Sequence, residues 1–249
     1  MSETHTILVT GGTGTLGRLV TERLRAAGHE VRVLSRGSRP HAVDLRKGGP
    51  GLDAALAGVA TVVHCASSPR GGDEGAARNL VAAAARAGVT HLVYISIVGV
   101  DRVPLPYYRA KHAVERIVER SGIGWTVLRT TQFHDLVHQV LATLAKSPVM
   151  PVPSGFADQP IEVAEVADRL AALAVGAPAG RVPDMGGPEV RDFADLARAY
   201  FAATGRRRPL LPVRLPGKTY RGFAAGGHLA PERAVGKGTF EDFLATRPA

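Results

Sequence analysis

The sequence predicts an α/β fold in which a doubly wound parallel sheet is followed by a small C-terminal lobe. Short runs of β-branched and aliphatic residues alternate with helical stretches in the first half of the chain, as in parallel strands joined by crossover helices. A glycine-rich turn follows the first run, and prolines cluster after about residue 146, where the alternation stops. We expect residues 1–147 to form the sheet domain and residues 148–249 to form the lobe, packed together as a single structural unit.

The predicted elements follow one another in the order that such a sheet requires. Strands are predicted at residues 6–9, 31–34, 42–45, 61–64, 92–96 and 125–128. Helices are predicted at residues 16–27, 52–57, 75–87 and 107–121. Gly28 and Gly88 follow two of these helices and suit helix C-caps. In the C-terminal part, helices are expected at residues 163–175, 193–203 and 240–245.

The composition is that of an ordinary globular protein. The chain has 249 residues, of which 45% are hydrophobic and 21% charged, enough for a full core. No apolar stretch is long enough to span a membrane, and the first residues, Met1 to His5, lack the layout of a signal peptide. The single cysteine, Cys65, excludes an internal disulfide and suits a reducing compartment. We expect a soluble cytoplasmic protein without a membrane partner.

The chain carries a net charge of +9, but its basic residues are dispersed. The exception is the run from Arg206 to Arg208, which has no interleaved aromatic residues. Nucleic-acid binding favours a clustered basic stripe with stacking aromatics. The sequence therefore predicts a solvated basic loop and no nucleic-acid partner, while the positive field favours an anionic small molecule.

The first predicted βα turn contains Gly12-x-Gly14-x-x-Gly17 between a strand and a helix. Glycines permit positive φ and remove the Cβ atoms that would keep the backbone off a pyrophosphate. The following helix directs free N–H groups and its positive dipole end at the phosphates. This context predicts a Rossmann-type dinucleotide-binding turn. The residues expected to bind there are Gly11, Thr13, Gly14, Thr15, Leu16 and Gly17.

The segment after the second predicted strand indicates which dinucleotide is bound. NAD-selecting folds place a carboxylate there for the ribose 2′-hydroxyl, but residues 34–39 contain none, and Ser35 and Arg36 stand in its place. An arginine matches a 2′-phosphate bidentately, and the serine adds a hydroxyl donor. We predict NADP(H) as the cofactor. The alternative is that Arg36 and Arg39 are solvated loop charges.

The glycine pattern also resembles that of the extended and atypical short-chain dehydrogenase/reductase superfamily, most closely its NmrA-like NAD(P)-binding branch. The resemblance covers roughly residues 5–175. Its further segments are residues 62–67, 79–84 and 125–129. The resemblance implies that Ala66 and Ser67 line the nicotinamide side and that Phe133 contacts the ring. It also implies that Asp44 and Leu45 lie beside the adenine, although Asp44 as a turn residue is an equal alternative.

The segment Tyr107-x-x-x-Lys111 contains the candidate catalytic residues. On a helix the two side chains are one turn apart and share a face. In the resembled family the lysine holds the nicotinamide ribose and favours the phenolate, and the tyrosine donates a proton to the substrate. An unperturbed phenol titrates near 10, so a neighbouring cation is needed to bring it towards neutrality.

Two features depart from the family's usual mechanism: the proline-containing segment between Ser96 and Tyr107 is shorter than extended members usually have, and the expected hydroxyl residue is displaced. The best register places Ile97 where a serine or threonine should bind the substrate carbonyl, with Ser96 one residue early. A shift of one residue on a strand turns a side chain to the other face. Ser96 is therefore expected to line the cofactor cleft, and Ile97 the substrate. His134 is an alternative acid or substrate donor, although a helix-start residue without chemistry is favoured; no residues have metal-ligand spacing.

Three functions follow from these predictions. The first is an NADPH-dependent oxidoreductase that reduces a small organic carbonyl, enone or imine held between the sheet and the lobe. The second is a non-catalytic NADP(H)-binding regulator, which the missing serine makes credible. The third is a non-redox isomerase or epimerase, ranked last because it needs the full set of catalytic residues. Both a monomer and a homodimer fit the sequence.

Overall fold

The computed structural model describes residues 5–37 and 39–247. Residues 1–4, Ser38 and residues 248–249 lie outside the described residues. The chain divides into two compact units. Unit 1 comprises residues 1–96, 106–129 and 166–183, and unit 2 comprises residues 97–105, 130–165 and 184–249.

Unit 1 is organised around a parallel sheet. The described residues form six strands in the order β2-β1-β3-β4-β5-β8. Their bounds are β1 Thr6–Thr10, β2 Glu30–Leu34, β3 Thr61–His64, β4 His91–Ile97, β5 Gly124–Thr130 and β8 Gly180–Arg181. The pairs β1–β2, β1–β3, β3–β4 and β5–β8 are all parallel. The strand order reverses between β1 and β3, which is where open α/β sheets bind their ligands.

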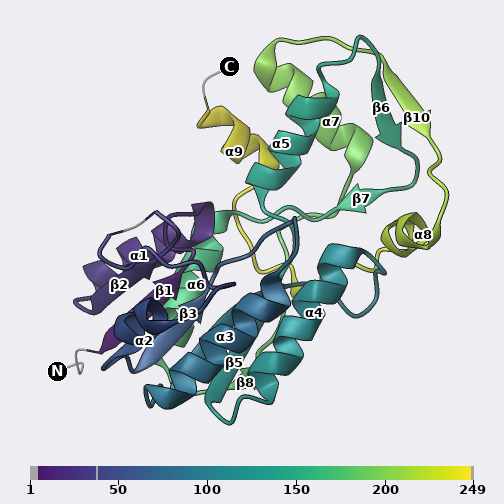
Figure 1. Cartoon of the computed structure of the whole chain (residues 1–249). Coiled ribbons are helices and arrows are strands. Elements are labelled where there is room, and N and C mark those ends of the chain that lie inside the picture. Colours follow the sequence, from purple (N-terminus) through teal and green to yellow (C-terminus); the bar gives the residue numbers. More distant parts are fainter. Residues whose placement is uncertain (1–4, 38, 248–249) are drawn as a thin grey trace. The chain divides into compact units, whose positions relative to one another are not determined.

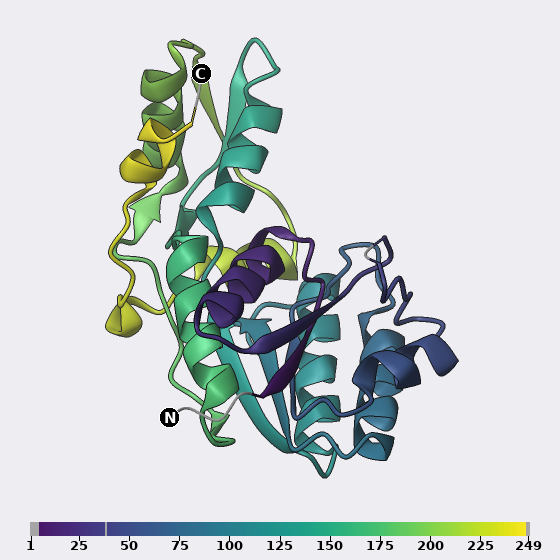
Figure 2. The ribbon, with the colours of Figure 1, turned by 90° about the vertical axis from the view of Figure 1, so that its left-hand side faces the viewer.

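Helices cover both faces of this sheet. Helices α1 (Thr15–Ala26) and α6 (Val163–Val175) lie on one face, while α2 (Pro50–Leu56), α3 (Asp73–Arg86) and α4 (Pro106–Glu119) lie on the other (Figures 1 and 2). The core on the second face consists mainly of fully buried leucines, alanines and valines, joined by Tyr94. Each buried leucine contributes roughly 1.5–3 kcal/mol. The predicted α/β class and the doubly wound parallel sheet are confirmed.

One predicted strand is reduced to a single bridge. Residues 42–45 were expected to form a third strand, but only Ala42 pairs, with Ser35. The side-chain amide of Asn79 donates to the carbonyl oxygens of Leu45 at 2.8 Å and Arg46 at 3.1 Å. These bonds satisfy two carbonyl groups at the end of the segment without a strand partner.

Unit 2 has shorter elements and its own core. Its helices are α5 His134–Leu144, α7 Phe193–Thr204, α8 Lys218–Ala224 and α9 Phe240–Ala245, with a 3₁₀ turn at Pro231–Arg233. Its strands are β6 Met150–Pro153, β7 Ala157–Asp158, β9 Arg191–Asp192 and β10 Leu210–Val213. Strand β10 pairs with β6 in parallel, and β7 pairs with β9 antiparallel. Aromatic side chains of α7 and α9 form much of the core. The helices predicted from residues 163, 193 and 240 onwards are confirmed.

The two units do not coincide with the division predicted at residue 147. The segment 166–183, which contains most of α6 and β8, belongs to the sheet unit, whereas residues 130–147 belong to unit 2. The chain therefore passes between the units several times. Among the described residues, no helix has the length and apolar character to cross a membrane.

Candidate functional site

The glycine turn between β1 and α1 closes through its own backbone. Gly11 has φ +65°, and its carbonyl oxygen accepts a hydrogen bond from the Gly14 N–H at 2.9 Å. A Cβ atom on Gly17 would lie 2.8 Å from the carbonyl carbon of Gly11 and 2.9 Å from the Cα of Gly12. A side chain at Gly17 would therefore force α1 away from the turn.

The outer side of the turn fits a pyrophosphate. Thr13, Gly14 and Thr15 are exposed, no side chain caps α1 at Gly14, and its first turn carries no acid. A Cβ on Gly14 would meet only the Gly11 carbonyl oxygen within 4 Å, at 3.3 Å. An uncapped helix N-terminus beside exposed glycines is a ready anion site. Leu16 and Gly17 are buried, so they can contribute only backbone N–H groups.

Two arginines follow β2 where an NAD-selecting fold places an acid. Arg36 and Arg39 are exposed and make no ion pair with any residue that the structure describes. The Ser35 hydroxyl accepts from the Gly37 N–H at 3.3 Å. The guanidinium groups are therefore available to a phosphate, as the prediction requires.

Asp44 and Leu45 have contacts within the protein itself. The Asp44 carboxylate accepts from the Arg46 backbone N–H at 3.1 Å and pairs with its side chain, and these bonds lower the pKa of Asp44. Leu45 is buried in the core of unit 1. The turn role of Asp44 is thus observed, and a role beside the adenine stays a prediction for both residues.

The loop after β3 is fastened to the end of β1. The Thr10 hydroxyl accepts from the Ala66 N–H at 3.3 Å and bonds to Nδ1 of His64 at 2.7 Å. His64 is buried and stacks on Tyr94, and burial lowers its pKa to about 3. These contacts give His64 a structural role. Burial likewise raises the pKa of the Cys65 thiol to about 12.

Tyr107 lies at the start of α4 and bonds to the loop after β3. Its hydroxyl is 2.8 Å from Oγ of Ser67, which in turn donates to Oδ2 of Asp73 at 2.7 Å. Burial raises the pKa of Tyr107, the hydrogen bond with Ser67 partly offsets the increase, and the negative charge of Asp73 adds to it. The phenol is therefore protonated at neutral pH and can act as a proton donor.

Lys111 faces the interior of unit 1. Its ammonium donates to the Ile95 carbonyl oxygen at 2.7 Å and lies 4.4 Å from the centre of the Tyr94 ring. The side chain is 3% exposed, and burial lowers its pKa to about 8. Lys111 and Tyr107 therefore bond to different partners, Ile95 and Ser67, and the expected effect of the lysine on the phenol stays a prediction.

Ser96 and Ile97 occupy the end of β4. Ser96 is 1% exposed, and its hydroxyl has no hydrogen-bond partner among the described residues. Ile97 is partly exposed and has no polar group for a carbonyl. The structure therefore offers no hydroxyl at the family's usual position, and the predicted roles of both residues stay predictions.

In unit 2, His134 has the contacts of a packing residue. It is 1% exposed, its Nε2 lies 3.1 Å from the Gly238 carbonyl oxygen, and its ring contacts Phe240 and Phe243. Burial lowers its pKa. These contacts favour the role without chemistry. Phe133 immediately precedes α5 and is partly exposed.

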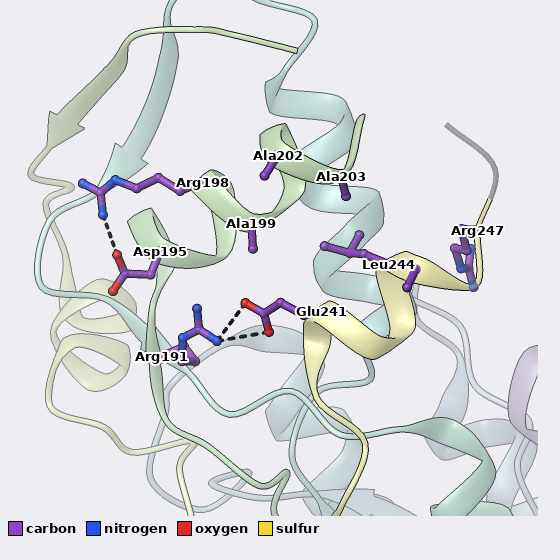
Figure 3. Close-up of a pocket in the computed structure, with 10 residues that line it drawn as sticks. Arg191, Asp195, Arg198, Ala199, Ala202, Ala203, Glu241, Leu244 and Arg247 are labelled. Atoms are coloured by element: carbon purple, nitrogen blue, oxygen red, sulfur yellow. Dashed lines mark hydrogen bonds and ion pairs between the residues drawn. The ribbon is translucent and has the colours of Figure 1, made fainter. Parts of the chain in front are cut away.

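Unit 2 also contains a hollow of about 730 Å³ between α7 and α9 (Figure 3). Its floor consists of alanines and Leu244. Its three arginines are engaged by carboxylates, because Arg191 pairs with Glu241 at 3.1 Å, Arg198 with Asp195, and Arg247 with Asp135. No residue predicted to bind the cofactor or substrate lines it.

Asp73 and Tyr94 contact the candidate site residues Ser67 and Lys111, but the sequence did not predict this. Asp73 is the first residue of α3, where an acid is normally explained by the helix dipole. Tyr94 is a buried strand residue, and a tyrosine at such a position is normally assigned to the hydrophobic core. Neither position carries a spacing signal, since their partners come from other elements.

Comparison with known proteins bears on this arrangement. The family model described as NAD(P)H-binding matches residues 11–175. The (4-alkanoyl-5-oxo-2,5-dihydrofuran-3-yl)methyl phosphate reductase of Streptomyces griseus is 33% identical over 201 residues, covering 74% of this chain and 68% of the reductase.

Two solved structures share the fold. The NADPH complex of an NADPH-dependent quinone oxidoreductase from Escherichia coli has a TM-score of 0.78 at 19% identity, covering 96% of this chain and 98% of its own. A short-chain dehydrogenase/reductase superfamily protein from Agrobacterium tumefaciens with bound NAD has a TM-score of 0.72 at 22% identity, covering 97% of this chain and 95% of its own. The predicted resemblance is confirmed at the level of NAD(P)H binding: the family model matches well over half of the chain, which belongs to the NAD(P)H-binding family.

Proposed function

We propose that this protein is an NADPH-dependent reductase of a small organic molecule, with an enone as the leading substrate class ahead of an isolated carbonyl or an imine. One observation carries the proposal. Unit 1 combines an open, uncapped glycine turn with a partly exposed phenol, Tyr107, at the start of α4. A neutral phenol donates a proton, which is what the reductive direction requires.

The residues of unit 1 account for cofactor binding. We assign the pyrophosphate to the N–H groups of the glycine turn and the 2′-phosphate to Arg36 with Ser35. When bound, the reduced dinucleotide supplies hydride to the substrate. Lys111 is the weakest member of the predicted set, because its ammonium already donates to the Ile95 carbonyl oxygen.

The Streptomyces griseus relative supports the enone class. Its name describes a ring alkene conjugated to the 5-oxo group and to the 4-alkanoyl group. Reduction of such an alkene places negative charge on the conjugated system, which must then receive a proton. Tyr107 is the donor in this proposal, with no contribution from Ile97.

Turnover of a compound panel tests the proposal. Purified protein is mixed with NADPH and butenolides, other enones, quinones, ketones and imines, and loss of the reduced-nicotinamide absorbance is followed. We expect turnover with an enone and a decrease of about 100-fold or more in Tyr107→Phe. Tyr220→Phe is the control, since Tyr220 bonds to Ser154 within unit 2. Tight NADPH binding without oxidation across the panel would refute the reductase and favour the regulator.

A further inference from the structure

Three side chains from different elements of unit 1 form a continuous hydrogen-bonded chain. Tyr107 comes from α4, Ser67 from the loop after β3, and Asp73 from the first turn of α3. The Tyr107 and Ser67 oxygens are 2.8 Å apart, and the Ser67 and Asp73 oxygens are 2.7 Å apart. The chain therefore links the candidate proton donor to a carboxylate that it does not touch directly.

The direction of each bond follows from the chemistry of the groups. An ionised carboxylate has no hydrogen to donate, and a serine hydroxyl has only one. Because Ser67 gives its hydrogen to Asp73, the bond between Ser67 and Tyr107 must be donated by the phenol. The phenol must then carry its proton for the chain to be complete.

Asp73 is fixed in a way that maintains this order. Its side chain is 7% exposed, and its other oxygen, Oδ1, accepts from the Ser68 backbone N–H at 2.8 Å. Other charged or titratable groups around the chain are Tyr94 on β4, Cys65 after β3, and Lys111 and Glu115 on α4. The ammonium of Lys111 interacts electrostatically with both carboxylates, Asp73 and Glu115.

We propose that Asp73 and Ser67 are positioning residues that fix the direction of the Tyr107 hydroxyl bond and so keep the proton on the phenol until a substrate takes it. The inference rests on the proposed function, in which Tyr107 is the proton donor. In that step the phenol O–H bond breaks, the proton forms a new bond to the reduced substrate, and the phenolate regains a proton from water at this partly exposed position.

Replacing Asp73 with asparagine should reverse the chain. The new amide can donate to Ser67, which frees the Ser67 hydrogen for the Tyr107 oxygen. A hydrogen bond donated to the phenolate stabilises the charged form, and loss of the carboxylate charge acts in the same direction. We expect the pKa of Tyr107 to fall by about one unit or more in Asp73→Asn.

The test is a pH titration of tyrosinate absorbance in the full-length protein without cofactor. Each variant is measured with and without Tyr107→Phe, so that the difference isolates Tyr107 from the other tyrosines. Glu74→Gln is the matched control, because it removes a negative charge from the same turn of α3 at a side chain that pairs with Arg78 rather than Ser67. Ser67→Ala provides a second route, and thermal unfolding checks that each variant is folded.

The proposal expects a clear decrease in the Tyr107 pKa in Asp73→Asn, a small one in Glu74→Gln, and a reduced effect of Asp73→Asn when Ser67 is already alanine. An unchanged Tyr107 pKa in folded Asp73→Asn would overturn it, as would equal shifts in the two charge variants. If Asp73→Asn does not fold, an unchanged Tyr107 pKa in Ser67→Ala overturns it. Because the titration needs no turnover, a shift in a protein that reduces nothing would refute the proposed function while leaving the positioning supported.

Discussion

The glycine turn is held by backbone atoms, whereas the start of α4 is held by side chains. At the turn, the Gly14 N–H meets the Gly11 carbonyl oxygen, and α1 packs directly against that peptide. At α4, Tyr107 reaches Ser67 while Lys111 reaches the Ile95 carbonyl oxygen. The first region is therefore limited by excluded volume, and the second by charge and hydrogen bonding. The stability of the glycine turn should therefore respond to added methyl groups, whereas the stability around α4 should respond to pH and to charge substitutions.

The largest expected effect is a loss of stability on α4, the helix that side chains hold in place. Glu115 on α4 and Arg129 on β5 form a buried ion pair with bonds of 2.8 and 2.6 Å. Glu115→Ala should lower the free energy of unfolding by about 3–5 kcal/mol, since it leaves a buried charge without this partner. Denaturant unfolding measures the loss. Glu119→Ala, at an exposed position of the same helix, is the control and should change little; an equal loss there would contradict the explanation.

The next effect concerns Lys111 and pH. Burial lowers its pKa from 10.5 to about 8, so between these values the unfolded chain binds more protons than the folded one. Stability gains from this residue as pH rises through that window, and its cost is fully present below about pH 8. Lys111→Met should therefore flatten the rise in stability between pH 7 and 10 by up to about 3 kcal/mol. Parallel denaturant curves at the two pH values measure this, and an unchanged slope would refute the assignment.

The next prediction concerns cofactor choice, which we assign to the end of β2 rather than to either of the two regions. Arg36→Ala should weaken NADPH binding by roughly 10- to 150-fold, which corresponds to one charge-assisted hydrogen bond of about 1.5–3 kcal/mol. NADH binding should not change. Fluorescence titration with the two cofactors measures the ratio, and Arg78→Ala, which removes a paired surface charge, is the control. If Arg36→Ala keeps its preference for NADPH, this arginine does not select the cofactor.

The smallest expected loss of stability tests the backbone region. Gly17→Ala should cost about 1–3 kcal/mol, because its Cβ overlaps the Gly11 peptide. Gly14→Ala should cost less, since its Cβ meets only one atom at 3.3 Å, yet it places a methyl group on the proposed phosphate side. Thermal unfolding should therefore show the larger loss of stability in Gly17→Ala, whereas NADPH binding should be weakened in Gly14→Ala despite its smaller loss of stability. Equal stability losses would show that the turn is not limited by excluded volume.

The sequence predicted the sheet unit well because its signals are local. Glycine spacing at residues 12, 14 and 17, and alternation of strands and helices, depend on neighbours in the chain. It did not predict that Tyr107 would bond to Ser67, and through it to Asp73, because these residues lie about 40 and 34 positions away in the chain. Helical spacing correctly placed Tyr107 and Lys111 one turn apart. It could not show that burial directs the lysine to Ile95 and Tyr94, because that depends on the strand beneath the helix.

The closed backbone of the glycine turn has a consequence for redesigning the enzyme. Gly11 and Gly17 have no room for a side chain, so variation there cannot tune which dinucleotide is bound. The exposed positions after β2 have that freedom, since Arg36 and Arg39 carry no ion pair that other described residues depend on. A library aimed at switching between phosphorylated and unphosphorylated cofactors should therefore randomise residues 35–39 and hold the glycine turn constant.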